Sequence, residues 1–436
     1  MSLFTFSFVL NLESLFSGFD YFCKVMENSK KKAAIGFIFI TLLIDVIGLG
    51  IIIPVIPKLI EELIHGSVNE AAKYGGWLGF AYAFTQFLFS PVIGNLSDKY
   101  GRRPIILISL FGFAVDYIFL ALAPTIGLLF VGRIIAGITG ASFTTASAYI
   151  ADISTDKDRS KNFGLIGAAF GLGFIIGPLL GGVLGHFGAR VPFYAAAVLC
   201  LINFLYGYFI LPESLDKDKR REFDWKRANP IGSFKFLLKH PELSGLVLTL
   251  FLVYIAGHAV QTNWSYFTMA EFKWTELTVG ISLGVVGFLV AVVQGFLIRW
   301  TAPKLGDYKS IYIGLALYAI GMLLFSFATE GWMMFVILIP YCLGGICGPS
   351  LQSVISKGVP ANEQGELQGA LTSLMSITST IGPPLMTNLF YHFSEKTSSF
   401  RFPGAPFFLA FILMAISVFL TYFNFKKKEI RKDVVE

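Results

Sequence analysis

The stretch that decides the fold is "FITLLIDVIGLGIIIPVIP", residues 39–57. It is an apolar run with one carboxylate, Asp45, near its middle. A membrane-spanning helix needs roughly 20 mostly apolar residues. A charge at the centre of such a helix costs roughly 2.5–3.5 kcal/mol on insertion scales. The stretch therefore predicts a membrane helix in which Asp45 has a functional task.

The rest of the chain repeats this pattern. Of its 436 residues, 55% are hydrophobic and 14% are charged, whereas soluble domains carry about 25% charged residues. Twelve apolar runs are long enough to span a bilayer, and we predict an all-α membrane protein with twelve transmembrane helices, since the short alternating segments of a membrane β-barrel are absent from the sequence. The runs lie at 35–58, 75–95, 104–123, 126–150, 163–185, 191–211, 243–268, 277–299, 309–327, 331–354, 365–389 and 405–424.

The basic residues predict the orientation. If the loops alternate and the N-terminus is cytoplasmic, the cytoplasmic segments hold most of the 34 Lys and Arg residues. This positive-inside bias places both termini in the cytoplasm, and we expect a multi-pass protein of a bacterial inner membrane. The net charge of +6 is explained by this bias, so no nucleic-acid partner is expected. The opposite loops hold Lys58, Lys73, Arg190, Lys273, Lys396 and Arg401.

The chain is predicted to consist of two halves. Residues 212–242 form a long, basic cytoplasmic linker, with a short amphipathic helix expected near 230–239. The linker separates a first six-helix bundle, 34–211, from a second, 243–425, and a basic cytoplasmic tail follows at 426–436. Residues 1–33 are either an amphipathic helix on the inner surface or lie upstream of a true start at Met26.

The two halves carry an internal repeat. "GITGAS" at 137–142 matches "GICGPS" at 345–350, and "IGP" at 176–178 matches "IGP" at 381–383. Gly101 and Gly306 match at nearly the same offset, each in the equivalent loop. Parallel repeats are found in alternating-access transporters, which bind substrate between the halves near mid-membrane.

The connection between the second and third runs, "GNLSDKYGRRP" at 94–104, resembles the signature of the major facilitator superfamily, G-x-L-[AS]-D-[RK]-x-G-R-[RK], at every position. The resemblance implies a gating loop and latch. In the family picture Asp98 lies by the amino end of span 11, near 365–368, and Arg102 pairs with Asp152. The residues implied in this loop and latch are Gly94, Asp98, Gly101, Arg102, Arg103 and Asp152.

Span 5, "GLGFIIGPLLGGVLG" at 171–185, is rich in glycine. It is no nucleotide-binding loop, because no strand precedes it. Small residues at this spacing let helices pack closely, which alone explains the pattern. The stretch also resembles the antiporter motif of proton-coupled exporters in this superfamily, with Gly173, Gly177, Pro178, Gly181 and Gly182.

Three charges lie well inside the predicted spans of the first half: Asp45, Asp116 and Arg133. Charges within a membrane mark transport pathways by default, although Arg133 could equally be half of a buried structural ion pair. A carboxyl group between a low dielectric and an arginine is subject to opposite effects on its pKa. Our hypothesis is that Asp45 couples transport to protons, with Arg133 tuning it. Asp116 could instead be a structural hydrogen-bond acceptor.

Residues 34–425 resemble the tetracycline/proton antiporters, through stretches such as "AVDYIFLALAP" and "EQGELQGALTSLMSITSTIGP". Asp45, Asp116 and Arg133 match important charges of those pumps. The second half departs from them, because Val290 and Tyr318 stand where the pumps carry a histidine and an aspartate.

The second half offers aromatic and polar side chains instead. Tyr254, His258, Gln261 and Ser265 recur on one face of a helix. Either they are core residues or they line a cavity for an amphipathic organic molecule. The expected substrate-binding residues are Tyr254, His258, Gln261, Gln294, Tyr318 and Tyr341.

The expected function is proton-coupled export of a small amphipathic compound by alternating access, with the lipid bilayer as surroundings and the monomer as functional unit. The alternative is a nutrient or sugar symporter or facilitator of the same fold. The sequence predicts no enzyme, cofactor or metal, because it shows no catalytic set and no ligand cluster.

Overall fold

A computed structural model describes residues 34–140, 142–154, 158–225, 240, 243–360, 363–395 and 400–433. These residues are helical apart from short connections, and no strand occurs among them. The predicted extension at 1–33 and the predicted helix near 230–239 lie outside the described residues. The elements are a first span Ala34–Ile52, α2 (Ile56–Ile64), α3 (Val68–Tyr100), α4 (Arg102–Leu122), α5 (Ile126–Thr139), α6 (Ser142–Ile153), α7 (Arg159–Gly185), α8 (Val191–Ile210), a 3-10 turn η1 (Lys217–Lys219), α10 (Ser244–Phe272), α11 (Glu276–Val292), a π-helix η3 (Val293–Leu297), α12 (Ile298–Ser326), α13 (Gly331–Leu343), η4 (Gly344–Ile346), α14 (Cys347–Lys357), α15 (Gln364–Ser394) and α16 (Ala405–Asp433).

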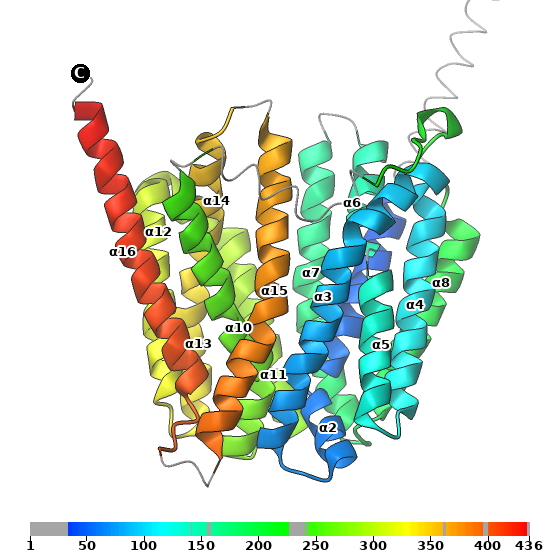
Figure 1. The fold of residues 1–436 in the computed structure, drawn as a ribbon, viewed down its shortest axis with the longest axis horizontal. Helices are drawn as coiled ribbons and strands as arrows, with labels where there is room; N and C mark the ends of the chain where they lie inside the picture. Colours follow the sequence, from blue (N-terminus) through cyan, green and yellow to red (C-terminus); the bar gives the residue numbers. More distant parts are fainter. Residues whose placement is uncertain are drawn as a thin grey trace, which may run out of the picture.

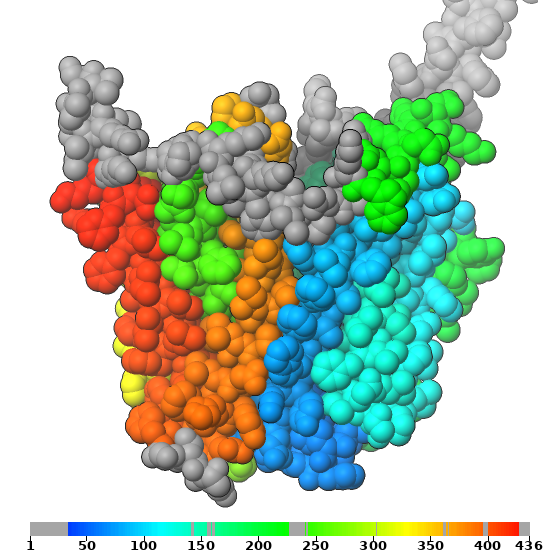
Figure 2. All heavy atoms as spheres, in the orientation of Figure 1, coloured from blue at the N-terminus to red at the C-terminus, as the bar shows by residue number. Residues whose placement is uncertain are grey.

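The helices up to α8 lie on one side of the molecule, and α10 and the helices after it lie on the other (Figure 1). Ten segments among the described residues are long and apolar enough to cross a membrane. The helices α3 and α15 are long as well, with 33 and 31 residues, but they are more polar and do not meet the same criterion. These two helices pack along each other down the middle of one face (Figure 2). The prediction of an all-α membrane protein is confirmed.

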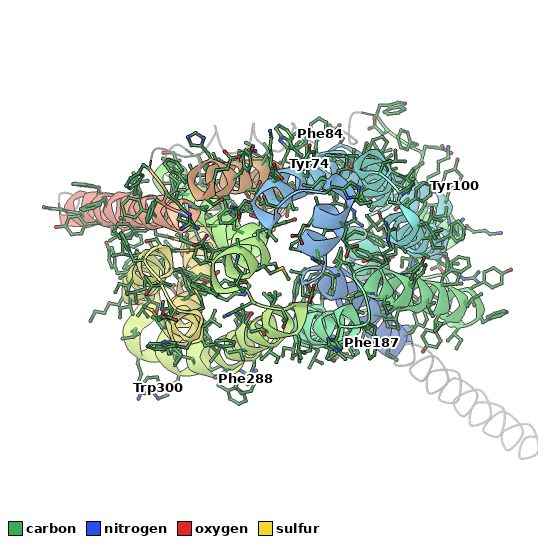
Figure 3. The ribbon with its side chains drawn as sticks, turned by 90° about the horizontal axis from the view of Figure 1, so that it is seen from below. Tyr74, Phe84, Tyr100, Phe187, Phe288 and Trp300 are labelled. Carbon is green, nitrogen blue, oxygen red and sulfur yellow. The ribbon has the colours of Figure 1, made fainter. Side chains whose placement is uncertain are left out.

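Large aromatic side chains surround the bundle. Figure 3, a view along the helices, shows Phe84, Phe187, Phe288 and Trp300 pointing away from its centre. Phe288 and Trp300 are each 60% exposed. Exposed apolar side chains on this scale fit a bundle that is surrounded by lipid, since lipid tails are as apolar as the side chains themselves.

Several helix boundaries differ from the predicted ones: α3 extends beyond 75–95 at both ends, α12 begins at Ile298 before the predicted 309, and the first span and the last helix differ as well. The first predicted span, 35–58, ends at Ile52, and the chain turns before the separate helix α2. Pro54 lies in this turn and Pro57 near the start of α2, where a missing backbone N–H is tolerated. At the other terminus α16 continues through the predicted tail to Asp433.

The repeat seen in the sequence recurs in the backbone. Gly101 and Gly306 both have positive φ, +105° and +70°, a region that favours glycine. The equivalent spans are also both interrupted. The helix α5 ends at Gly140 before α6 begins, and α13 passes through the 3-10 turn η4 into α14. Each matched glycine segment thus divides a span near its middle.

The two ends of the bundle differ in how the halves meet. We call the end that carries α2 the α2 end, and the end that carries the 94–104 connection and residues 211–225 the linker end (Figure 1). At the α2 end Asn69 Nδ2 donates to the Ser394 carbonyl, 3.2 Å away, and Ser265 Oγ donates to the Ile53 carbonyl, 3.2 Å away. Both hydrogen bonds join the two halves.

Glycines on α3 tighten the same contact. The Tyr266 hydroxyl of α10 fills the space beside Gly75, and the Thr387 side chain of α15 fills the space beside Gly76. One turn further, a Cβ at Gly79 would lie 3.2 Å from Pro383. Larger residues at these positions would hold the helices apart, so the glycines permit a close seal at the α2 end.

Toward the linker end the helices α7 and α11 diverge. Near the α2 end, Gly280, Gly284 and Gly287 of α11 pack against α7. On the same face of α7 a Cβ at Gly171 or Gly164 would have no atom within 4 Å. The space between these two helices therefore opens from the α2 end toward the linker end.

Candidate functional site in the membrane-spanning bundle

A buried ion pair joins α4 and α5. Arg133 Nη2 contacts Asp116 Oδ2, and the two residues are 7% and 0% exposed. Gly132 makes this approach possible, because a Cβ there would lie 2.8 Å from the carboxylate of Asp116. The guanidinium also lies over the ring of Tyr82 from α3, 5.8 Å from its centroid, a cation–π arrangement that suits a desolvated arginine.

Asp45 lies in the same region, on the first span, and is 7% exposed. Its Oδ1 is 3.5 Å from Nδ2 of Asn203 on α8, which also donates to the Thr41 carbonyl at 3.1 Å. Asp45, Asp116 and Arg133 all act electrostatically on Tyr82. The three charges predicted from sequence thus form one cluster. The direct partner of Arg133 is Asp116, so the ion pair that the sequence left open for Arg133 forms with Asp116, and the hypothesis that Arg133 tunes Asp45 stays a prediction.

Three polar residues of this cluster were missed in the sequence. They are Tyr82, Gln86 and Asn203. Gln86 Nε2 donates to the Tyr82 hydroxyl at 3.1 Å and to the Gly140 carbonyl at 2.9 Å. It therefore holds the interrupted end of α5 beside the aromatic ring that covers Arg133. A lone amide in an apolar run was the available signal, since an amide in lipid needs partners.

The loop at 94–104 is held by ionic contacts. Arg102 bridges two carboxylates, with Nη1 2.5 Å from Asp98 Oδ1 and Nε 3.0 Å from Asp152 Oδ2. All three residues belong to the first half. Nearby, Arg103 Nη2 donates to the Tyr208 carbonyl at 2.6 Å, and a Cβ at Gly94 would meet no atom within 4 Å.

The residues after α8 cover this loop. One oxygen of Glu213 accepts the backbone N–H groups of Arg102, Ser214 and Leu215 at 2.8, 3.0 and 3.1 Å. Ser214 Oγ donates to Asp152 at 3.1 Å, and the Arg221 N–H donates to the Asp98 carbonyl at 3.1 Å. The carboxylate of Glu213 thus supplies acceptors at the start of α4, where a helix has unpaired donors. The sequence analysis did not single out Glu213.

The glycine-rich motif of span 5 lies between two helices. A Cβ at Gly173 would lie 2.6 Å from Val46, one at Gly177 would lie 2.8 Å from Gly50 Cα, and Gly181 faces the Ile51 carbonyl. Gly182 faces the opposite direction, and a Cβ there would lie 2.7 Å from the Glu276 carbonyl oxygen of α11. The motif therefore packs α7 both against the first span and against the other half. Pro178 contributes to the contact with the first span, because a Cβ at Gly50 would lie 2.8 Å from Pro178 Cδ.

The residues predicted to bind substrate fall into two groups. Gln261 lines a cavity of about 150 Å³ between the halves, together with Ser265, Tyr266 and Pro383. His258, one turn before Gln261, is 7% exposed and packs against Gly382 of α15. Gln352 Nε2 lies 3.5 Å from the Tyr254 hydroxyl. This group lies along the helix α10, where Gln261 faces the cavity between the halves, and Tyr254 and His258 contact α14 and α15 of the second half.

The second group lies further from α10. The rings of Tyr318 and Tyr341 are in contact, with centroids 5.3 Å apart, and Tyr341 also contacts Phe325. This is an aromatic cluster inside the second half. Gln294 lies in the π-helix η3 and is exposed. Irregular turns of this kind are frequent at functional sites.

Among the described residues, no group of three or more His, Cys, Asp and Glu side chains could hold a metal ion. The described cysteines, Cys200, Cys342 and Cys347, are buried and free. The polar side chains buried among the described residues include the carboxyl groups of Asp45 and Asp116, the guanidinium groups of Arg102 and Arg133, and the imidazole of His258.

A bundle of long apolar helices with an interrupted repeat and buried charges defines a secondary transporter. The model of the Major Facilitator Superfamily matches residues 38–383 and 246–434, and the chain belongs to this family. It is 40% identical over 361 residues to the tetracycline resistance protein, class C, of Escherichia coli, covering 83% of this chain and 90% of that one. It is 30% identical over 363 residues to multidrug resistance protein 2 of Bacillus subtilis (strain 168), covering 81% and 88%.

The fold is also shared with a solved structure. The crystal structure of the human organic anion transporter MFSD10 matches with a TM-score of 0.68 at 23% identity, over 90% of this chain and 99% of that one. At this identity the likeness concerns the fold alone. The chain is a multi-pass membrane transporter of the Major Facilitator Superfamily.

Proposed function

We propose that this chain exports a small amphipathic organic compound in exchange for protons. The observation that carries the proposal is the cluster of Asp45, Asp116 and Arg133 inside the first half. Relatives that share up to 40% of the sequence are named for resistance to tetracycline, so tetracycline is the first compound to test. Val290 and Tyr318 make a panel of other amphipathic compounds equally necessary.

Asp45 is the group that we propose to bind the proton. Asp116 is held by Arg133, and removing one partner of a buried ion pair costs about 3–5 kcal/mol. Protonation of Asp116 would neutralise one partner in the same way. A proton on Asp45 leaves that pair intact. Arg133 and Asp116 would then supply a fixed charge environment in which Asp45 loads a proton on one side of the membrane and releases it on the other.

The orientation follows from the charges of the loops. We propose that the linker end faces the cytoplasm and that the α2 end faces outward, because basic loops stay inside. The conformation is then inward-facing: the α2 end is sealed by Tyr266, Thr387 and Ser265, and α7 and α11 diverge toward the cytoplasm. In the opposite state, Asp98 would approach the start of α15, as the family resemblance implies.

The substrate would enter from the cytoplasmic side and reach the cavity beside Gln261. Tyr254, His258 and Gln261 line one side of this route. Aromatic and amide side chains suit a compound with both apolar rings and polar substituents. Opening of the α2 end would then release the compound outside while Asp45 accepts a proton.

The first experiment measures accumulation of a fluorescent cationic dye, and growth in tetracycline, in cells that express the chain, with and without an uncoupler. Expression-dependent exclusion that the uncoupler abolishes is expected. Asp45→Asn should abolish proton-driven efflux while the protein remains abundant in the membrane. The control is Asp216→Asn, which changes an exposed carboxylate beside Lys219 and should transport normally. Proton-driven efflux by Asp45→Asn would refute the role of Asp45. Proton-linked sugar uptake without dye exclusion would favour the symporter instead.

A further inference from the structure

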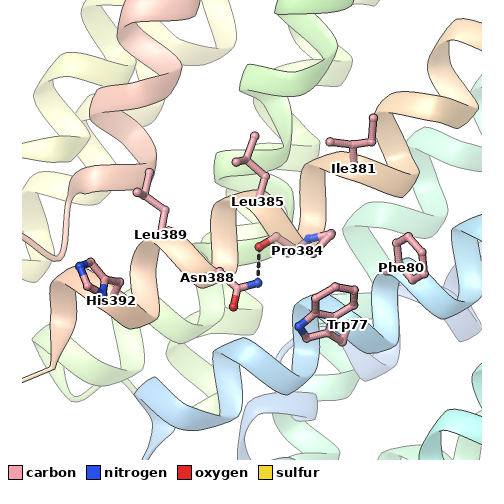
Figure 4. Close-up of a pocket in the computed structure, with 8 residues that line it drawn as sticks. All are labelled: Trp77, Phe80, Ile381, Pro384, Leu385, Asn388, Leu389 and His392. Carbon is pink, nitrogen blue, oxygen red and sulfur yellow. Dashed lines mark hydrogen bonds between the residues drawn. The ribbon is translucent and has the colours of Figure 1, made fainter.

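A large apolar groove lies on the outside of the bundle, at the seam of the two halves. It has a volume of about 600 Å³ and is lined by Trp77 and Phe80 of α3 on one side. The residues from α15 form the other side (Figure 4). They are Ile381, Pro384, Leu385, Asn388, Leu389 and His392.

The lining is apolar even where the sequence is polar. Asn388 Nδ2 donates to the Pro384 carbonyl of its own helix at 2.6 Å (Figure 4), so one donor of this amide is satisfied within α15. Trp77, Ile381 and Leu385 are 42%, 47% and 41% exposed. In a membrane helix such exposure is exposure to lipid, and the occupant must be apolar along its length.

The dimensions of the groove fit one acyl chain. The lining residues of α15 run from Ile381 to His392, and at 1.5 Å per residue these eleven steps cover about 16 Å. One leaflet of the hydrocarbon core is about 15 Å thick. His392 lies two residues before the end of α15, so the groove runs from the membrane surface at the α2 end toward the bilayer centre.

The mouth of the groove carries charges of both signs. Lys73 Nζ lies over the ring of Tyr391, 5.4 Å from its centroid. The Tyr391 hydroxyl donates to Glu395 Oε1 at 3.0 Å. The carboxylate of Glu70 accepts the Ser67 N–H in the cap of α3. An ammonium at the end of an apolar groove is complementary to a phosphate, and the neighbouring Glu395 is complementary to a cationic headgroup.

We propose that this groove binds one phospholipid of the leaflet at the α2 end, with an acyl chain along Trp77 and Leu385 and the phosphate at Lys73. Because the walls come from α3 in one half and from α15 in the other, the lipid contacts both halves at once. A ligand that binds one conformation better than another stabilises that conformation. The bound lipid therefore stabilises the sealed α2 end, whichever compound the chain exports.

The experiment uses the full chain in lipid nanodiscs that contain a low fraction of phosphatidylethanolamine with brominated acyl chains, which quench tryptophan fluorescence on contact. The contribution of Trp77 is the difference between the unchanged protein and Trp77→Phe. The control is Trp300, which is 60% exposed on α12 and is measured in the same way with Trp300→Phe. Because a lipid bound at a site exceeds its random share, quenching of Trp77 should be at least about twofold stronger than quenching of Trp300.

A second pair of variants tests the headgroup. Lys73→Gln should reduce the excess quenching of Trp77 to the level of Trp300. Lys58→Gln, which changes another exposed lysine at the α2 end, should leave the excess unchanged. Equal quenching of Trp77 and Trp300 would overturn the proposal, as would an equal effect of the two lysine variants. Release of the excess quenching by the exported compound would assign the groove to that compound and would overturn the lipid site.

Discussion

The α2 end and the linker end of this bundle are held by different forces. At the α2 end the two halves are joined by close packing, with side chains of one half seated on glycines of the other, such as Tyr266 on Gly75. At the linker end the described ionic contacts of the 94–104 loop join segments of the first half, with Arg102 between Asp98 and Asp152, and one exposed pair, Lys99–Glu222, joins the loop to the linker. Close packing is sensitive to small changes in side-chain volume. Exposed ionic contacts are weakened by salt.

This difference fits a transporter that opens one end at a time. When the helices tilt, the contacts at Gly75, Gly76 and Gly79 can break without leaving a buried charge that has lost its ionic partner. The described ionic contacts of the loop reach the first half and the linker and none reaches the second half, so the first half can move as a body. The helix α7 carries the contrast along its own length, since it is packed against α11 at Gly182 and open at Gly171.

The largest expected effect comes from a test on α7 itself. Gly182→Ala places a Cβ 2.7 Å from the Glu276 carbonyl oxygen of α11, and this backbone cannot move aside. Overpacking of this kind costs about 1–3 kcal/mol, so the purified protein should unfold at a clearly lower temperature. Gly171→Ala is the matched control, because its Cβ meets no atom within 4 Å. Equal melting temperatures for the two variants would contradict the contrast along α7.

The seal of the α2 end is tested at Gly76. Gly76→Ala meets the side chain of Thr387, so it should weaken the sealed conformation by about 1–2 kcal/mol, a 5- to 30-fold change in population. A cysteine introduced at the α2 end should react faster with a membrane-impermeant thiol reagent added outside, and the rate of transport should fall.

Removal of the opposing side chain should rescue this variant. Thr387→Ala in the Gly76→Ala background removes the hydroxyl that would contact the new Cβ. The transport rate of the double variant should therefore be higher than the two single variants predict when their effects are added. A double variant that transports no better than Gly76→Ala would show that the two residues do not seal this end together.

A smaller effect is expected at Glu213. Glu213→Ala removes the acceptor for the Arg102 N–H at the start of α4 and for the N–H groups of Ser214 and Leu215, and this loss should cost about 1 kcal/mol, as for other helix caps. The fall in melting temperature caused by Glu213→Ala should change little with salt. The effect of substituting the exposed pair Lys99–Glu222 should be smaller at high salt, because exposed ion pairs are screened. Melting at low and high salt measures this. Asp216→Ala, at an exposed neighbour, serves as the control and should melt unchanged.

The sequence predicted the helices well because the bilayer sets their length. Each predicted span overlaps a described helix, and misplaced ends occur at Pro54, at both ends of α3, at the start of α12 and in the tail after 425. The proximity of Arg102 and Asp152 was expected from the family pattern. The partner of Arg133 was not, because Asp45 and Asp116 lie at similar depth in different spans. Only the packing of α4 against α5 at Gly132 decides between them.

By itself, the sequence determined the class of this protein, its family and the presence of three charges within the membrane. Apolar run length and charge asymmetry are local properties, and the bilayer acts on each span separately. The tertiary structure decided which charge meets Arg133, that Gln86 and Asn203 join the cluster, and which end is sealed. These outcomes depend on contacts between helices that are distant in the chain, and those contacts are set by where glycines let two helices approach.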